Sequence, residues 1–292
     1  MSGTPYAPHD PGPYAVAERD LSARDGARGR TFALTLWLPE ATGDAALPLI
    51  AYSHRSGGNR RSATFLARHL ASHGYVVAAL DHSETFVPEL ARRDGEDADA
   101  RAARIDAVMA ARVPDLRFLL DTALARAPDA GPHVDAARIG LAGHSFGGWT
   151  ALATLDVDDR ARSIVVHAPA GGRPTPPGTI PGVVEYRWSH PIPSLFIVAE
   201  GDTSLPIATM HELFARAPEP KRMVVLPDTD HLHFGDDVAT HHDALRAMFT
   251  EGPLAHLGTS MRPSAELMPG EEALRTVRGL TLAHFDATLR DG

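Results

Sequence analysis

The sequence contains no cysteine and only one lysine, Lys221. The absence of cysteine excludes disulfide bonds, thiolate metal sites and a cysteine nucleophile together. The net charge is −9 and no stripe of basic residues is visible, so we expect no nucleic-acid partner. No apolar run approaches the roughly 20 residues that a membrane-spanning helix needs. We therefore expect a protein without a membrane span.

Two further patterns are missing. The N-terminus lacks a basic segment followed by an apolar stretch, which is the pattern of a secretory leader. We expect a cytoplasmic protein, although a leader removed and replaced by Met1 would leave the same sequence. Glycine-rich nucleotide-binding motifs after a strand are also absent, and we expect no cofactor.

The chain does contain enough apolar material for a full core. Hydrophobic residues make up 43% of the 292 residues, with no internal repeat and no evident linker. Residues 1–13 are rich in proline and glycine and are predicted to form a flexible or loosely pinned tail. Residues 14–292 are expected to form one domain, with irregular excursions near 83–100 and 169–192. The first excursion is either a solvated loop or a flap over the site.

Short apolar runs alternate with helix-like segments over most of the chain. Their lack of polar alternation is typical of strands buried on both faces of a parallel sheet. These runs lie at 47–52, 75–80, 163–168, 194–199 and 223–226. Ahead of them, residues 14–21 and 31–38 flank Asp25-Gly26 and predict an antiparallel hairpin. We predict an α/β fold with a mostly parallel central sheet and helices on both faces.

The most informative stretch is G-H-S-F-G-G at residues 143–148. A short apolar run leads into it and a helix-prone run follows it. In a G-x-S-x-G turn between a strand and a helix, the serine is held in a strained backbone conformation and its hydroxyl is exposed above the sheet. We therefore predict that Ser145 is a nucleophile.

A serine hydroxyl needs a base to take its proton, and the base needs a carboxylate to orient it. In an open α/β sheet the functional residues gather beyond the carboxyl ends of the strands. Asp202 follows the run at 194–199, and His231 follows the run at 223–226. We predict that Ser145, Asp202 and His231 form a catalytic triad, with His231 as general base.

Neighbouring residues leave alternatives to this triad. Glu200 competes with Asp202 as the acid, and His233 competes with His231 as the base. A metal site is a third interpretation, because histidines and aspartates are dense at His231, His233, Asp236, Asp237, His241 and His242. An H-x-H pair without a fitting third ligand is a weak metal motif, so we expect no metal.

The oxyanion of an acyl-transfer intermediate needs two backbone N–H donors. We assign these to Phe146, which follows the nucleophile, and to Ser56 in the loop after the run at 47–52. The alternative interpretation is that this loop is only a glycine-rich turn into the next helix.

Substrate contacts are expected from side chains near the strand ends and in the excursions. His82, Trp149 and Trp188 are the candidates for binding, and the expected pocket walls are Phe86, Val87, Phe146, Val183, Val184 and Tyr186. Core packing is the alternative for each aromatic residue.

Residues 30–235 resemble the α/β-hydrolase superfamily, in particular the platelet-activating-factor acetylhydrolase-like and dienelactone-hydrolase-like esterases. The resemblance is carried by S-H-R-S-G-G at 53–58, A-S-H-G-Y-V-V-A-A-L-D-H at 71–82, G-H-S-F-G-G at 143–148 and D-H-L-H-F at 230–234. It implies the α/β-hydrolase fold and a serine esterase that cleaves short acyl chains from phospholipid or simple esters. It also implies the same triad and oxyanion donors. Dienelactone hydrolases proper use a cysteine nucleophile, which disfavours that activity here.

Arg55 departs from this resemblance, because similar proteins usually have glycine there. If the position requires a positive φ, arginine is strained and the oxyanion loop is reshaped, or the chain is a pseudoenzyme. With an ordinary φ, Arg55 points over the pocket mouth and binds an acidic group of the substrate.

The predicted function is cleavage of small-molecule carboxylic esters through an acyl-enzyme intermediate, by a monomer or homodimer. Polyester or lipid-type ester hydrolysis, and amide, thioester or perhydrolytic chemistry on the same triad, are the alternatives, since a fold does not fix a function. The remaining interpretation is a binding module or pseudoenzyme that has the hydrolase fold without the activity.

Overall fold

The computed structural model describes residues 6–43, 45–82, 93–130, 132–176, 179–249 and 255–290. Its centre is an eight-stranded sheet with the strand order β1-β2-β4-β3-β5-β6-β7-β8. The strands are β1 (Val16–Asp25), β2 (Arg30–Pro39), β3 (Leu47–Ser53), β4 (Val76–Leu80), β5 (Val134–His144), β6 (Ala161–His167), β7 (Ser194–Ala199) and β8 (Lys221–Leu226).

The sheet is mostly parallel, as predicted. β4, β3, β5, β6, β7 and β8 pair in parallel. The side chains of β3, β4, β6 and β7 are largely buried on both faces, whereas Leu226 is the one buried residue of the edge strand β8. β1 and β2 form the predicted antiparallel hairpin at one edge, and β2 pairs antiparallel with β4. The turn of the hairpin is closed by Asp25, whose carboxylate accepts the N–H groups of Ala27 and Arg28.

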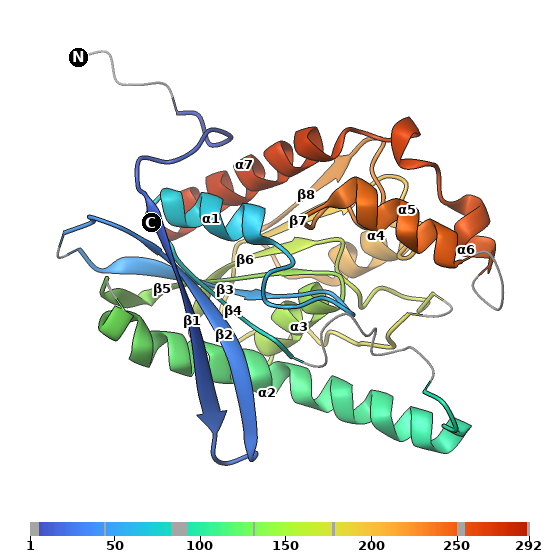
Figure 1. The fold of residues 1–292 in the computed structure, drawn as a ribbon, viewed down its shortest axis with the longest axis horizontal. Helices are drawn as coiled ribbons and strands as arrows, with labels where there is room; N and C mark the ends of the chain where they lie inside the picture. Colours follow the sequence, from blue (N-terminus) through green and yellow to red (C-terminus); the bar gives the residue numbers. More distant parts are fainter. Residues whose placement is uncertain are drawn as a thin grey trace.

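Helices cover both faces of the sheet (Figure 1). The helices are α1 (Thr64–Ser72), α2 (Ala98–Ala130), α3 (Phe146–Thr154), α4 (Ile207–Arg216), α5 (Val238–Met248), α6 (Ala255–Ser260) and α7 (Gly270–Leu289), with a short 3₁₀ turn at Ser264–Glu266. Apolar residues of α2, α3 and α4 pack in one core cluster, and those of α1 and α7 pack in a second. Each cluster fills one face of the sheet. Among the described residues, no helix combines the length and apolarity that crossing a membrane requires.

The described part of the N-terminal segment is held by hydrogen bonds to two helices. The ring of His69 in α1 donates to the carbonyl oxygen of Pro8 at 2.8 Å, and the N–H of Gly12 donates to Ser72 Oγ at 2.9 Å. On α7, Asp286 accepts the hydroxyl of Tyr6. Proline and glycine content predicts the lack of regular structure but does not reveal these side-chain partners.

α2 is one continuous helix through Pro114, and α5 and α6 follow β8 in the chain. The described part of 169–192 has neither helix nor strand, in agreement with the predicted excursion. The predicted pocket residues Phe86 and Val87, and most of the first excursion, lie outside the described residues.

Candidate active site

Parallel strands bring the three predicted triad residues to one edge of the sheet. Ser145 directly follows β5, Asp202 follows β7 and His231 follows β8, and these strands are close neighbours in the sheet order. Because the strands are parallel, their carboxyl ends lie on the same edge, and residues far apart in sequence meet there.

The turn at Ser145 has the strained geometry that its motif predicts. Ser145 has φ 57° and ψ −119°, a backbone conformation that residues other than glycine rarely adopt. Its N–H donates to the carbonyl oxygen of His167 at 2.9 Å, and its own carbonyl accepts the N–H of Ala170 at 3.0 Å. A Cβ added at Gly147 would lie 1.9 Å from the carbonyl oxygen of Ser53. Glycine is therefore required where this turn packs against the end of β3.

A continuous series of hydrogen bonds joins the three side chains. His231 Nε2 lies 2.8 Å from Ser145 Oγ, and His231 Nδ1 lies 2.7 Å from Asp202 Oδ2. Asp202 is 5% exposed and His231 is 8% exposed. With Nδ1–H donating to the carboxylate, Nε2 is the nitrogen that accepts the serine proton. The arrangement therefore has the geometry of an activated nucleophile.

The carboxylate of Asp202 is fixed by its own loop. Its Oδ1 accepts the N–H groups of Ser204 at 2.9 Å and Leu205 at 2.7 Å, which leaves Oδ2 for the histidine. A second carboxylate, Asp230, joins the two loops. Its Oδ1 accepts the backbone N–H of Thr203 at 3.1 Å and that of His231 at 2.6 Å. Asp230 therefore ties the loop that carries the acid to the loop that carries the base.

His144 supports His231 from behind. Its Nε2–H donates to the carbonyl oxygen of His231 at 2.9 Å, and the centroids of the two rings are 4.9 Å apart. Burial lowers the pKa of His144 well below its usual range, and the neighbouring imidazole of His231 lowers it further. A neutral ring at this position places no charge against an imidazolium that forms on His231.

The competing residues have other partners. Glu200 accepts the N–H of Asp228, and the ring of His233 is bonded to the backbone at Asp230 and Met268. The imidazole of His241 donates to the carbonyl oxygen of Asp236, and that of His242 donates to the backbone carbonyl oxygen of Arg262. These bonds direct the neighbouring histidines to separate backbone carbonyls. The described residues contain no group of three or more histidine and carboxylate side chains placed to hold a metal ion.

The predicted oxyanion donors lie on the two backbone segments that flank the nucleophile. Phe146 is the first residue of α3, so its N–H has no acceptor one helical turn earlier. Ser56 lies in the loop after β3. The positive φ of this loop falls on Gly57, at 66°, and Arg55 has a negative φ. Arginine at position 55 is therefore unstrained. Strain at this position was the structural reason for interpreting the chain as a pseudoenzyme, and that reason is removed.

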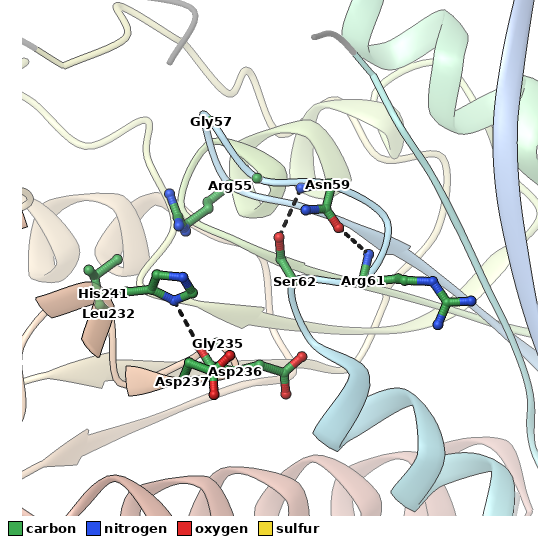
Figure 2. Close-up of a pocket in the computed structure, with 11 residues that line it drawn as sticks. Arg55, Gly57, Asn59, Arg61, Ser62, Leu232, Gly235, Asp236, Asp237 and His241 are labelled. Atoms are coloured by element: carbon green, nitrogen blue, oxygen red, sulfur yellow. Dashed lines mark hydrogen bonds between the residues drawn. The ribbon is translucent and has the colours of Figure 1, made fainter. Parts of the chain in front are cut away.

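A cavity of about 260 Å³ lies between the oxyanion loop and the loop that follows His231. It is lined by Arg55, Gly57, Gly58, Asn59, Arg61, Ser62, Leu232, Gly235, Asp236, Asp237 and His241. Figure 2 shows the guanidinium of Arg55 reaching from its loop toward Leu232 and His241. Arg61 is bound by the carboxylates of Glu18 and Asp20. The cavity thus lies beside Leu232, the residue that follows His231, whereas the sequence favoured the two excursions as pocket walls.

The predicted substrate-binding residues lie in different environments. His82 is 4% exposed, and its two ring nitrogens are bonded to Ser53 and Asp115. This placement corrects the expectation that His82 contacts a substrate, because the ring lies behind the oxyanion loop. Trp149 stacks on Phe146 and donates its indole N–H to Val183 at 3.0 Å.

Trp188 is half-buried and packs edge-on against Tyr186. Both aromatic side chains lie against the core cluster of α2, α3 and α4. The binding roles of Trp149 and Trp188 remain predictions.

Three supporting residues were missed from the sequence. His144 occupies the variable second position of the serine motif, Asp230 directly precedes His231, and Arg112 lies in the middle of α2. Arg112 is 1% exposed, its guanidinium carbon lies 4.1 Å from the centroid of the Phe146 ring, and it donates to the carbonyl oxygen of His54. For Arg112, the one indication in the sequence is that an arginine stands between apolar positions of a predicted helix.

Comparison with known proteins gives three kinds of similarity. The pattern of the family described as platelet-activating factor acetylhydrolase, isoform II, matches residues 35–88. The chain is 26% identical over 262 residues to the protein called uncharacterized protein YfhR of Escherichia coli O157:H7, covering 82% of this chain and 83% of that one. It is 26% identical over 206 residues to a bis(hydroxyethyl) terephthalate hydrolase of Streptomyces coelicolor, covering 70% of this chain and 54% of the hydrolase.

A solved structure shares the architecture. The ferulic acid esterase from Streptomyces cinnamoneus superposes with a TM-score of 0.62 at 22% identity, covering 96% of this chain and 91% of the esterase. The fold is therefore that of the α/β-hydrolases. The matching family and the terephthalate hydrolase are both named for ester hydrolysis, and this chain is similar to each over the residues given.

Proposed function

We propose that this protein cleaves carboxylic esters with short acyl chains through a covalent acyl-enzyme at Ser145. The observation that carries the proposal is the unbroken series from Ser145 Oγ through His231 to Asp202, with distances of 2.8 and 2.7 Å. The strained φ of Ser145 supports it, because that conformation holds the hydroxyl against the imidazole.

The proposed reaction has two halves. His231 Nε2 takes the proton of Ser145 while Oγ attacks the ester carbonyl, and the N–H groups of Phe146 and Ser56 stabilise the resulting oxyanion. The carbonyl re-forms and the C–O bond to the alcohol breaks. The alcohol leaves with the proton from His231. A water then attacks the acyl-enzyme by the same route, and Ser145 recovers its proton as the carboxylic acid departs.

The acyl preference has a direct test. We expect kcat/KM for p-nitrophenyl esters to fall steadily from acetate through butyrate to octanoate, measured below the concentrations at which the esters form micelles. The sequence has no long apolar lid, and the cavity beside His231, about 260 Å³, is small for a ligand site.

The matched control for this series is p-nitroacetanilide, which differs from the acetate only in the scissile bond. Faster cleavage of the anilide than of the ester would replace the ester proposal with amide chemistry on the same triad. A rate maximum at octanoate would overturn the short-chain preference alone.

We further propose that Arg55 binds an acidic group on the alcohol side of the substrate. The leaving alcohol must receive its proton from His231, and the cavity that Arg55 lines also contains Leu232, the next residue along the chain. Guanidinium groups are well suited to carboxylate and phosphate. The proposal concerns recognition, and the triad chemistry does not depend on it.

The change that tests Arg55 is Arg55→Gln, which keeps part of the side-chain stem and removes the charge. We expect KM for 4-acetoxybenzoate to rise about 10-fold, the effect of one lost charged hydrogen bond. The neutral methyl ester of the same compound serves as the control, because it differs only in the charge of the alcohol. Equal KM values for the two substrates before and after the change would rule the contact out.

A further inference from the structure

A second Ser-His-Asp series lies behind the oxyanion loop. Ser53 Oγ lies 2.9 Å from His82 Nε2, and His82 Nδ1 lies 3.2 Å from Asp115 Oδ2. Ser53, His82 and Asp115 are 0%, 4% and 0% exposed. No substrate reaches a hydroxyl buried to this degree. The series therefore needs an explanation other than nucleophilic catalysis.

The series is anchored by arginines. Asp115 Oδ1 accepts Arg28 at 2.6 Å and Arg30 at 2.9 Å, and Arg30 also donates to the carbonyl oxygen of His82 at 2.7 Å. Burial lowers the pKa of His82 well below its usual range, and the nearby guanidinium groups add to this effect. The neutral ring donates Nδ1–H to Asp115 and accepts the hydroxyl of Ser53 at Nε2. Both its ring and its backbone are thus fixed.

His82 in turn determines the tautomer of His54. The backbone N–H of His82 donates to His54 Nε2 at 3.2 Å, so the proton of the neutral His54 ring is on Nδ1. That Nδ1–H donates to the carbonyl oxygen of Arg55 at 2.7 Å. Arg112 NH1 donates to the carbonyl oxygen of His54 itself at 3.0 Å. His54 is 1% exposed, and its ring connects the buried series to the oxyanion loop.

The peptide between Arg55 and Ser56 is the one that His54 orients. Its carbonyl oxygen accepts both His54 Nδ1–H and the N–H of Gly58, the latter at 3.1 Å. In a planar trans peptide the carbonyl and the N–H point in opposite directions. Holding the Arg55 carbonyl toward the His54 ring therefore turns the Ser56 N–H away from that ring. The backbone of Ser53 and His54 lies against Gly147, two residues after the nucleophile.

We propose that His54 is a positioning residue that aims the Ser56 N–H at the developing oxyanion, with His82, Asp115 and Arg112 as its support. The inference rests on the proposed function, in which the Ser56 N–H stabilises that charge. It goes further, because it assigns the precision of the oxyanion hole to a buried hydrogen-bonded series on the far side of the loop.

Two isosteric changes separate the two bonds of His54. In His54→Asn the amide nitrogen takes nearly the place of Nδ1 and still donates to Arg55. In His54→Gln the amide reaches the place of Nε2 and meets the N–H of His82, but nothing donates to Arg55. We expect His54→Gln to lower kcat about 100-fold, near the effect of losing one oxyanion donor, and His54→Asn to lower it less than about 10-fold. KM should change little in either variant.

The affinity for a trifluoromethyl ketone, which forms a tetrahedral adduct with the serine, distinguishes a positioning role from a purely structural one. A purely structural role of His54 would leave this affinity unchanged. The inhibition constant of the ketone should weaken in proportion to kcat/KM across the variants. The control is His69→Gln, which alters another buried histidine bonded to a backbone carbonyl, that of Pro8. It should change the melting temperature as much as His54→Gln does and leave kcat unchanged.

Equal losses in the Asn and Gln variants, a loss confined to KM, or an unchanged ketone affinity in His54→Gln would overturn the inference. Labelling of the unaltered enzyme with a fluorophosphonate separates this failure from that of the proposed function. If unaltered Ser145 is not labelled, the acyl-enzyme proposal fails. If it is labelled and the variants behave alike, only the role of His54 is lost.

Discussion

Ser145→Ala is expected to abolish ester turnover, with a loss in kcat on the order of 10⁶-fold. The physical reason is that the change removes Ser145 Oγ, the atom that in the proposed reaction forms a bond to the carbonyl carbon of the ester. His231 and Asp202 would remain bonded to each other, and the oxyanion donors would remain, so the residual rate is that of substrate binding and electrostatic stabilisation alone. The measurement is the hydrolysis of p-nitrophenyl acetate by the purified variant.

A covalent probe makes this result specific. A fluorophosphonate should add once to the unaltered chain, on the peptide that contains Ser145, and should not add to the alanine variant. Ser163→Ala is the matched control, since it removes another buried serine hydroxyl, which lies in β6 and is hydrogen-bonded to Thr288 of α7. Labelling that persists without Ser145, or turnover within about 100-fold of the original, would show that another nucleophile acts.

Asp202→Asn should cost about 10⁴-fold in kcat with little change in KM. The cause is a change of tautomer. Oδ1 of Asp202 accepts the N–H groups of Ser204 and Leu205, so the single oxygen of asparagine will stay with those two donors. Its NH₂ group then faces His231 Nδ1, and the imidazole proton moves to Nε2. A protonated Nε2 cannot accept the proton of Ser145.

Asp230→Asn provides the comparison within the same pair of loops. Asp230 is also buried, at 2% exposed, but it accepts backbone N–H groups and does not contact the His231 ring. We expect it to lower the melting temperature and to cost less than about 10-fold in kcat, because an amide oxygen still accepts those N–H groups. The kcat values and melting curves of the two variants, measured side by side, check this. Comparable losses in kcat would mean that the charge of Asp202 has no special role.

Much of the fold could be predicted because its signals are local. The buried strands are short apolar runs, and the hairpin is marked by Asp25-Gly26, so strand order along the chain is readable from the sequence. The serine motif predicts Ser145 as the nucleophile, and the order of polar residues after the later strands predicts Asp202 and His231 as its partners. Each of these inferences needs only a few adjacent residues and the rule that parallel strands end at the same edge.

The errors arose where a residue's role depends on partners distant in sequence. His82 reads as a polar residue at a strand end, and its burial follows from Asp115, which is 33 positions away. The sequence of the N-terminal segment likewise does not reveal the hydrogen bonds that α1 and α7 supply to it. The small cavity lies between the loops after β3 and β8, which no local pattern connects.

The sequence by itself determined the fold class, and it predicts the nucleophile and the chemical type of the site, because periodicity, turn residues and the serine motif act over a few residues. Only the tertiary structure decided which nitrogen of each histidine accepts a proton, which residues sit behind the loop after β3, and what Arg55 faces. Those properties depend on hydrogen bonds between segments that the folded chain brings together, and burial gives those bonds their directional strength.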